Sequence, residues 1–413
     1  MLAESEQSRK RVWVLGAGFS RSLRGPLMSD LLSLATRWQI RATYAKHISL
    51  EETDLVFWLF QFGMGFPDGP LDPDYSPRGE RRWQDAEQFL EILDNARFDP
   101  AGAELVRAVF MALKSSVPLQ SIEMMRSRYP LVFDKDLPAL NELAAMVRRT
   151  IAASCCTFLE GVTCDSARKK ERWRPYQQWL GSLRQHDSIL TFNYDRVVEL
   201  LSPTVRYGAA GSSHWGVHVL GLQNTVQERD RKDMAKAKLL PTLYKLHGSV
   251  NWRIVSGQVD PADWAPTLLE RGTDLAIATP GDSKMQMAIG VFGKLWEEAA
   301  QVLREADDVF VIGFRFPPSD AFPRDRLLTP LSENKRESLN VHVILGPDQN
   351  ADLRRVLALL HMTVLQKPQF DEIDNLNARA LITHSMWAED FLSAWARQEA
   401  TRRGNEVPTV DSD

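Results

Sequence analysis

Short apolar runs that end in glycine or polar residues recur along this sequence. A run of about four to eight apolar residues bounded by turn residues is the pattern of a strand buried on both faces. Such runs occupy residues 11–15, 188–191, 242–246, 274–279, 307–313, 340–345 and 363–365. Apolar residues at helical spacing lie between several of them, as in 291–306 and 353–360. This alternation predicts an α/β fold with a Rossmann-like, doubly wound and mostly parallel sheet.

The stretch 37–186 carries apolar residues at helical spacing and no strand-like run, so we expect a large helical insertion between the first and second strands of the sheet. The predicted organisation has residues 1–36 as the first part of the Rossmann-like domain, 37–186 as the insertion, 187–375 as the remainder of the domain, and 376–413 as a C-terminal helix and polar tail. Two segments, 66–82 and 203–240, are rich in glycine, proline or charge and are predicted to be surface loops.

The first strand runs directly into a glycine turn. Residues 16–20 read Gly-Ala-Gly-Phe-Ser, and a helical pattern begins near Leu31. In the order strand, glycine turn, helix, backbone N–H groups can approach a phosphate closely. Position 21 is Arg, so the third glycine of the dinucleotide-binding motif is missing, and a turn without a ligand is the alternative interpretation.

The second strand, 188–191, ends in polar residues. Asn193 and Asp195 follow it, ahead of an apolar helical pattern that includes Val197 and Leu201. Open α/β sheets bind ligands at the carboxyl ends of their strands, which makes both residues candidates for a binding site. The alternative is that they turn the chain and cap the helix.

A third strand ends in Leu246-His247-Gly248. An imidazole at such a strand end can titrate near neutral pH, so His247 is a candidate catalytic residue, although a lone histidine is more often structural. His214 and His218 have the spacing of a helical metal pair, but Gly216 lies between them. We therefore expect no metal site there.

Composition narrows the class of protein. The formal net charge is −4, so no basic excess indicates direct nucleic-acid binding. No apolar run reaches the roughly 18 residues that a membrane helix needs. The three cysteines, Cys155, Cys156 and Cys164, form no Cys-x-x-Cys pair, which excludes a structural zinc ribbon and fits a reducing compartment. We expect a cytoplasmic protein without a membrane segment.

Four motifs in order resemble the sirtuin-like domain, and most closely its branch in bacterial anti-phage defence systems. They are the segments 16–20, 191–195, 246–249 and 312–320, and the resemblance covers about residues 10 to 370. The ordered set is far more specific than any one motif. It implies a Rossmann-like site for NAD+, without a metal.

The resemblance assigns roles residue by residue. It implies catalytic roles for Asn193, Asp195 and His247, with Asn193 and Asp195 around the nicotinamide ribose and carboxamide. The residues implied in NAD+ binding are Gly16, Ala17, Gly18, Phe19, Ser20, Thr191, Phe192, Gly313, Phe314 and Arg315. Two departures concern the protein deacetylases of this family: no cysteine follows His247, and Phe192 replaces the glutamine before the asparagine. These departures put peptide-substrate binding in doubt.

The resemblance therefore implies an NAD+ glycohydrolase that depletes NAD+ during infection, as in abortive infection. It also implies a homo-oligomer and a co-encoded regulator such as a HerA-type ATPase. One alternative is a non-catalytic nucleotide-binding module whose helical part is an assembly surface. A zinc-free protein deacylase is a further alternative, disfavoured by the missing zinc ribbon.

Overall fold

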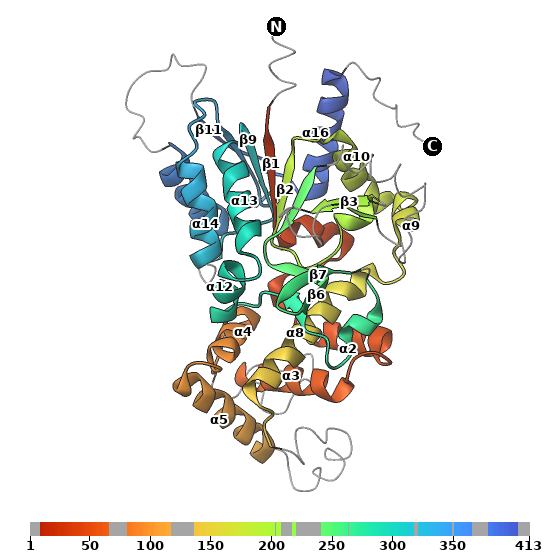
Figure 1. The fold of residues 1–413 in the computed structure, drawn as a ribbon, viewed down its shortest axis with the longest axis vertical. Coiled ribbons are helices and arrows are strands. Elements are labelled where there is room, and N and C mark those ends of the chain that lie inside the picture. Colours follow the sequence, from red (N-terminus) through yellow and green to blue (C-terminus); the bar gives the residue numbers. More distant parts are fainter. Residues whose placement is uncertain are drawn as a thin grey trace. The chain divides into compact units, whose positions relative to one another are not determined.

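The computed structural model describes residues 9–65, 81–116, 136–202, 204–207, 217–219, 241–262, 264–317, 321–348, 351–365 and 379–403. The chain forms two compact units. Unit 1 contains residues 1–25, 161–246 and 293–413, and unit 2 contains residues 26–160 and 247–292. Each unit is therefore assembled from segments that are far apart in the sequence (Figure 1).

An eight-stranded sheet lies at the centre of unit 1, in the order β11-β10-β9-β1-β2-β5-β3-β4. Its strands are β1 (Arg11–Leu15), β2 (Ser188–Thr191), β3 (Thr204–Tyr207), β4 (Val217–Val219), β5 (Thr242–Lys245), β9 (Asp308–Ile312), β10 (Asn340–Ile344) and β11 (Ala380–Thr383). Every pairing is parallel except that of β3 with β4. The predicted α/β class is confirmed, and the parallel sheet is compatible with a Rossmann-like fold.

The strand order creates a reversal next to β1. From β1 the chain moves outward through β2 to β5, and later returns to the other side of β1 for β9, β10 and β11. Leu15 of β1 is in register with Ile312 of β9 and with Thr191 of β2. The loops that follow these three strands thus start side by side at the carboxyl edge of the sheet, which is where open α/β sheets bind ligands.

Helices cover both faces of this sheet (Figure 1). They are η1 (Ala17–Leu23), α9 (Cys164–Arg168), η5 (Glu171–Trp173), α10 (Arg174–Ser182), η6 (Glu199–Leu201), α13 (Gly293–Arg304), α14 (Ala321–Ser332), α15 (Ala351–Leu360), η8 (His361–Leu365) and α16 (Ala388–Arg402). On one face the indole of Trp13 packs edge-on against Trp179 of α10 and Trp395 of α16 and stacks on Phe310 of β9. Such large aromatic surfaces supply much of the energy of core packing.

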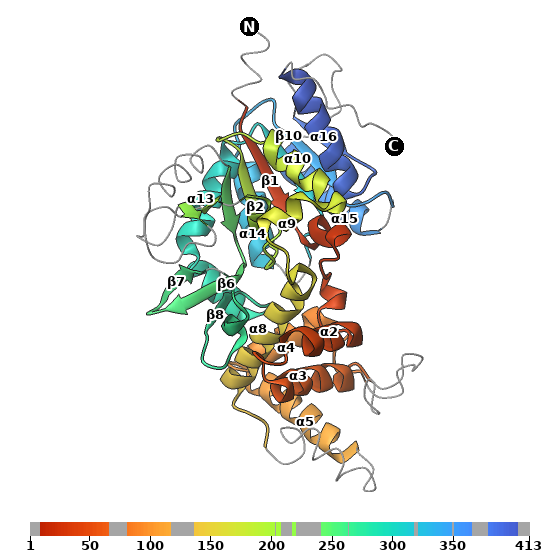
Figure 2. The same ribbon diagram turned by 90° about the vertical axis from the view of Figure 1, so that its right-hand side faces the viewer.

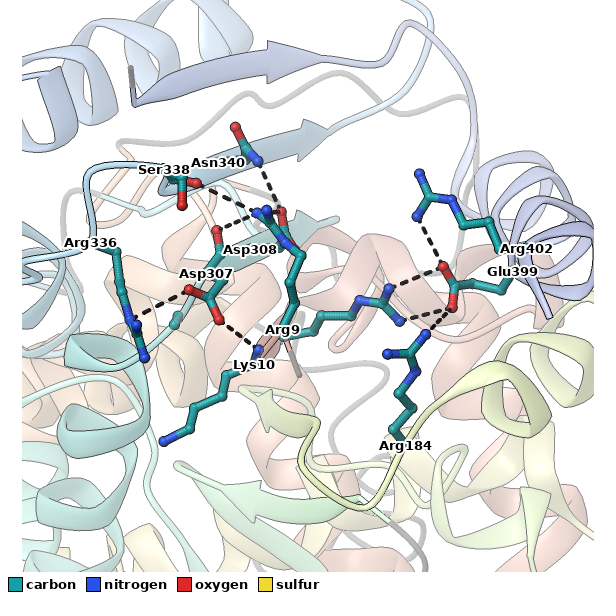
Figure 3. Close-up of polar contacts among 12 residues, drawn as sticks. Arg9, Lys10, Arg184, Asp307, Asp308, Arg336, Ser338, Asn340, Glu399 and Arg402 are labelled. Atoms are coloured by element: carbon teal, nitrogen blue, oxygen red, sulfur yellow. Dashed lines mark hydrogen bonds and ion pairs between the residues drawn. The ribbon is translucent and has the colours of Figure 1, made fainter. Parts of the chain in front are cut away.

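Charged side chains join the opposite, amino edge of the sheet to α16 (Figure 3). The carboxylate of Glu399 accepts two hydrogen bonds of 3.0 Å from the buried guanidinium of Arg11. Arg184 and Arg402 also donate to it, at 3.2 and 3.1 Å. Burial alone would raise the pKa of Glu399, but these three arginines outweigh burial and hold the pKa below its ordinary value. This cluster fixes α16 to β1.

Unit 2 combines helices with a small antiparallel sheet (Figure 2). Its helices are η2 (Met28–Asp30), α2 (Leu34–Tyr44), α3 (Leu50–Gly63), α4 (Ala86–Asn95), α5 (Pro100–Ser116), α8 (Leu140–Cys156), η4 (Thr157–Leu159), η7 (Pro266–Leu269) and α12 (Asp282–Ile289). The strands β6 (Gly248–Val255), β7 (Gln258–Pro261) and β8 (Leu275–Ile277) are in the order β7-β6-β8. Ser33, Ser49 and Asp85 cap α2, α3 and α4 by accepting a hydrogen bond from the N–H three residues later.

The structure corrects three predicted elements. The strand at 274–279 forms as β8, but in the small sheet of unit 2 and paired antiparallel to β6. The strand predicted at 363–365 is part of a π-helical turn, η8. The helix predicted after Asp195 is only the short 3₁₀ turn η6. The apolar pattern does not encode the pairing partner of a strand or the type of turn.

The boundaries of the two units differ from those of the predicted domains. The described elements within 37–186 are helices, as expected, but those of 37–160 share unit 2 with β6–β8, whereas those after residue 160 belong to unit 1. The segment after 375 supplies β11 and α16 to unit 1. Residues 66–80 of the predicted loop 66–82 lie outside the described residues. The described parts of the predicted loop 203–240 are the strands β3 and β4, because the edge of the sheet pairs with them there. No helix of the described chain is long and apolar enough to cross a membrane.

Candidate functional site

The two glycine loops at the carboxyl edge of unit 1 touch each other through their backbones. A Cβ atom at Gly16 would lie 2.6 Å from the carbonyl oxygen of Gly313, and one at Gly18 would lie 2.7 Å from the Cα of Gly313. Gly313 has a φ of 64°, in the left-handed region. Real Cβ atoms do not approach backbone atoms this closely, so the contact between the β1 and β9 loops requires glycine on both sides.

Several N–H groups of this turn are bonded within the protein. Gly16 donates to the carbonyl of Ile312 at 3.0 Å, Gly18 to that of Gly313 at 3.2 Å, and Phe19 to that of Gly16 at 2.9 Å. The predicted reason for these glycines was the close approach of a phosphate. The structure supplies another reason, the packing of two loops, and the approach of a phosphate to this turn stays a prediction.

Ser20 links the two polar residues that follow β2. Its hydroxyl donates to Asp195 Oδ2 at 2.7 Å and accepts from Asn193 Nδ2 at 3.0 Å. The Asn193 N–H donates to Thr191 Oγ1 at 3.1 Å, and Asp195 Oδ1 accepts from the Val197 N–H at 3.0 Å. The side chains of three predicted site residues, from two different loops, are thus joined in one hydrogen-bonded group.

Several groups around Asp195 shift its pKa in opposite directions. Desolvation by burial raises its pKa, while the charge of Lys245 and the hydrogen bonds from Val197 and Ser20 lower it, and the net shift is upward. A carboxyl group with a raised pKa and several directed partners is typical of functional sites.

Lys245 and Glu199 were not predicted from the sequence. Lys245 Nζ lies 2.8 Å from Glu199 Oε1, both side chains are buried, and the same ammonium donates to the backbone carbonyl of Asp195. The available signal was a single charge inside each of two apolar runs, at 243–246 and 197–201. A charge at such a position needs a buried partner, which these two residues provide for each other.

The aromatic residues predicted to contact NAD+ pack against one another and against the core. Phe192 and Phe314 stack with ring centroids 4.1 Å apart and are 7% and 5% exposed. The Phe19 ring packs edge-on against Tyr176 and Trp179. These rings join the loops after β1, β2 and β9 to one another and to the core, so their packing fixes the positions of the loops.

The loop after β9 is held in a strained conformation. Phe316 has a φ of 48°, which is unusual for a residue with a bulky side chain. Arg355 of α15 donates to the carbonyls of Arg315 and Phe316 at 2.6 and 2.8 Å. The exposed Arg315 side chain pairs with Asp352 at 2.8 Å. Strain of this kind persists where the surroundings fix the backbone, and it concentrates at functional loops.

His247 belongs to unit 2, whereas the other predicted site residues belong to unit 1. Its carbonyl accepts from the Ala278 N–H at 3.0 Å, and Gly248, with a φ of 79°, is required because a Cβ there would lie 1.8 Å from the carbonyl of Ala276. Burial, and then the charge of Lys284, lower the pKa of His247 well below its ordinary value. The imidazole is therefore neutral at pH 7, and its place beside Asn193 stays a prediction.

Within the described residues, no group of three or more histidine, cysteine, aspartate or glutamate side chains is arranged to hold a metal ion. The side chains of His214 and His218 lie outside the described residues. No protein-family model matches the chain, and no curated protein matches its sequence.

Proposed function

We propose that this protein is an NAD+ glycohydrolase that cleaves the bond between nicotinamide and ribose. The observation that supports this most strongly is the group Ser20–Asn193–Asp195 at the reversal of strand order beside β1. In doubly wound sheets with this order, a dinucleotide binds across the same point. The resemblance to sirtuin-like domains assigns Asn193 and Asp195 to the nicotinamide ribose and carboxamide, and Ser20 to the loop that binds NAD+.

The chemistry of the bond fits a site built from amide, carboxyl and imidazole groups. Nicotinamide leaves as a neutral molecule from a cationic precursor, so the leaving group needs no proton. Glycosidic cleavage passes through a transition state that resembles an oxocarbenium ion. The protein has to hold the ring, stabilise the developing positive charge and position a water molecule.

Each polar residue has a role in the proposed reaction. Asp195 accepts a hydrogen bond from the carboxamide of nicotinamide, and Asn193 bonds the ribose and orients the attacking water. His247 takes a proton from the water or a ribose hydroxyl. Its lowered pKa keeps the imidazole neutral at pH 7, the form that accepts a proton, although the same shift weakens it as a base. Ser20 keeps Asn193 and Asp195 in register with each other.

The biological setting is part of the same proposal. We propose an NAD+-depleting effector in anti-phage defence that acts as a homo-oligomer in the cytoplasm and is regulated by a co-encoded protein such as a HerA-type ATPase. The support is the ordered set of sirtuin-like motifs.

Release of nicotinamide and ADP-ribose from NAD+ tests the proposal, with the protein alone and with the proteins encoded beside it. Asn193→Ala should lose turnover and keep the thermal midpoint of the wild type. Asn340→Ala is the matched control, since Asn340 lies at the opposite edge of the same sheet and bonds Asp308; it should keep turnover. Wild-type protein that binds NAD+ but never releases nicotinamide would instead support the nucleotide-binding module.

His247→Ala tests the proposed base separately. Loss of a general base typically slows a reaction by about 10² to 10⁴. A variant within a few-fold of the wild-type rate would exclude this role for His247 without excluding hydrolysis.

A further inference from the structure

The ion pair of Lys245 and Glu199 lies directly beneath the residues of the proposed site. Lys245 is at the carboxyl end of β5, and Glu199 is in the turn η6 that follows Asp195. Lys245 is 0% and Glu199 1% exposed. The Lys245 ammonium bonds both the Glu199 carboxylate and the backbone carbonyl of Asp195. One side chain of β5 therefore holds both ends of the segment 195–199.

Stability alone is a poor explanation of this pair. Removing two charges from water is costly, and well-packed apolar residues of similar volume often stabilise a fold as well or better. What apolar side chains cannot do is donate a hydrogen bond to a chosen carbonyl oxygen. A buried ion pair is better explained when its geometry holds a particular conformation of the backbone. Here the Lys245 ammonium holds the backbone conformation of Asp195.

The hydrogen bonds of Asp195 show how its conformation is held. Its carbonyl is held by Lys245, its Oδ1 by the Val197 N–H and its Oδ2 by the Ser20 hydroxyl. The first bond fixes the peptide plane, and the other two fix the carboxyl group. The charge of Lys245 also opposes the effect of burial on the pKa of Asp195. Without Lys245, Asp195 would keep the bonds from Val197 and Ser20 to its carboxyl group but would lose the bond to its carbonyl.

We infer that Lys245 and Glu199 are positioning residues of the substrate site, and that they set the turn 193–199 in the geometry needed for turnover. This inference rests on the proposed NAD+ hydrolysis for its effect on rate. The effect on the turn itself is independent of any reaction. Neither residue is assigned contact with the substrate; both act through Asp195.

The test replaces both charges together, because removing only one would leave the other buried without its partner. In Lys245→Met with Glu199→Leu, we expect a folded protein with a thermal midpoint close to that of the wild type. Hydrogen exchange without substrate should become at least about tenfold faster at the amides of Asn193 and Val197. Turnover of NAD+ should fall about a hundredfold with little change in KM, because misplacement by about 1 Å has effects of that size.

The matched control is the buried pair at the opposite edge of the same sheet. Arg11→Met with Glu399→Leu removes a pair of similar burial and should leave exchange at Asn193 and Val197, and the rate per folded molecule, within about twofold of wild type. If the Lys245 and Glu199 variant also leaves exchange within twofold, the pair does not position the turn and the inference is overturned.

If exchange in the Lys245 and Glu199 variant rises but wild-type protein hydrolyses no NAD+ with or without its co-encoded proteins, the proposed function fails while the positioning of the turn stands. A double variant that does not fold would likewise overturn the inference, since the pair would then be needed for the fold.

Discussion

There is no room for a side chain at Gly18. The nearest atom to an added Cβ is the Cα of Gly313, which is backbone and cannot rotate away. Gly18→Ala should therefore separate the β1 and β9 loops and lower the free energy of unfolding by about 1–3 kcal/mol or more, measured by urea denaturation.

Gly181→Ala is the control for this substitution. Gly181 lies in α10 with nothing within 4 Å of an added Cβ, and alanine is favoured over glycine in helices by up to about 1 kcal/mol. A neutral or stabilised Gly181→Ala beside a destabilised Gly18→Ala is expected. Equal stability of the two variants would contradict the close contact of the loops.

A pair of histidines gives unit 1 an acid-sensitive point. His342 Nδ1 lies 3.0 Å from His384 Nε2, and the His342 ring stacks on Phe310. Burial lowers the pKa of His342 from 6.5 to about 4, an effect that Asp308 opposes and His384 adds to. The unfolded chain thus binds a proton that the folded chain excludes, so stability is present above pH 6.5 and is lost as the pH falls toward 4.

His342→Phe should keep the stacking and remove this pH dependence. Between pH 7 and pH 4, the wild type should lose on the order of 3 kcal/mol more stability than the variant, measured by urea denaturation at each pH. His186→Asn, at an exposed position, serves as the control. A wild type and a His342→Phe variant with parallel pH profiles would contradict the role of His342.

At the scale of elements, one buried carboxylate of α16 collects the charged contacts that hold this helix to the sheet. Glu399 of α16 accepts from Arg11, Arg184 and Arg402. Glu399→Gln keeps the shape of the side chain but leaves the buried Arg11 guanidinium without its counter-charge. Loss of one partner of a buried pair typically costs about 3–5 kcal/mol, and we expect a decrease of that order in the free energy of unfolding.

An exposed pair at the same edge of the sheet provides the comparison. Lys10 and Glu305 are 2.6 Å apart, but their side chains are 44% and 42% exposed. Glu305→Gln should change stability by no more than about 1 kcal/mol. Equal effects of the Glu399 and Glu305 substitutions would mean that burial does not decide the strength of these contacts.

The strands β1, β2, β5, β9 and β10 were predictable because each is a short apolar run bounded by turn residues. The helix α13 was predictable because its buried residues, such as Leu295 and Ala299, recur at helical spacing. The sheet to which β8 belongs was not predictable, since a run of Leu, Ala and Ile is equally apolar in either sheet. Pairing is decided by contacts distant in the sequence, which the local pattern does not contain.

The site was predictable to a similar extent. Asn193 and Asp195 were found because polar residues after a buried strand lie at the edge of a sheet, and the structure joins them through Ser20. The stacking of Phe192 on Phe314 was not predicted, and their contact with a ligand stays a prediction. Sequence gives the type of a residue and its place on an element, whereas the direction of its side chain depends on neighbours from other loops.

At the scale of the whole molecule, the chain leaves unit 1 between Leu246 and His247 and returns to it at Gly293. The proposed catalytic residues are therefore divided, with Asn193 and Asp195 in unit 1 and His247 at the start of unit 2. The proposed mechanism thus assigns roles to residues of both units. Binding should then stabilise amides in each of them against local opening.

Hydrogen exchange in the presence of ADP-ribose, which retains the ribose but cannot be hydrolysed again, measures this directly. The Val197 N–H, bonded to Asp195, reports on unit 1, and the Ala278 N–H, bonded to the carbonyl of His247, reports on unit 2. At a ligand concentration of about ten times Kd, exchange governed by opening of the bound region should slow by about tenfold at both amides. The Ala380 N–H, bonded to the carbonyl of Leu339 next to β10, is the control for a general change in stability. Protection at Val197 without protection at Ala278 would place the ligand in unit 1 alone, and would remove His247 from the proposed mechanism while leaving Asn193 and Asp195 in it.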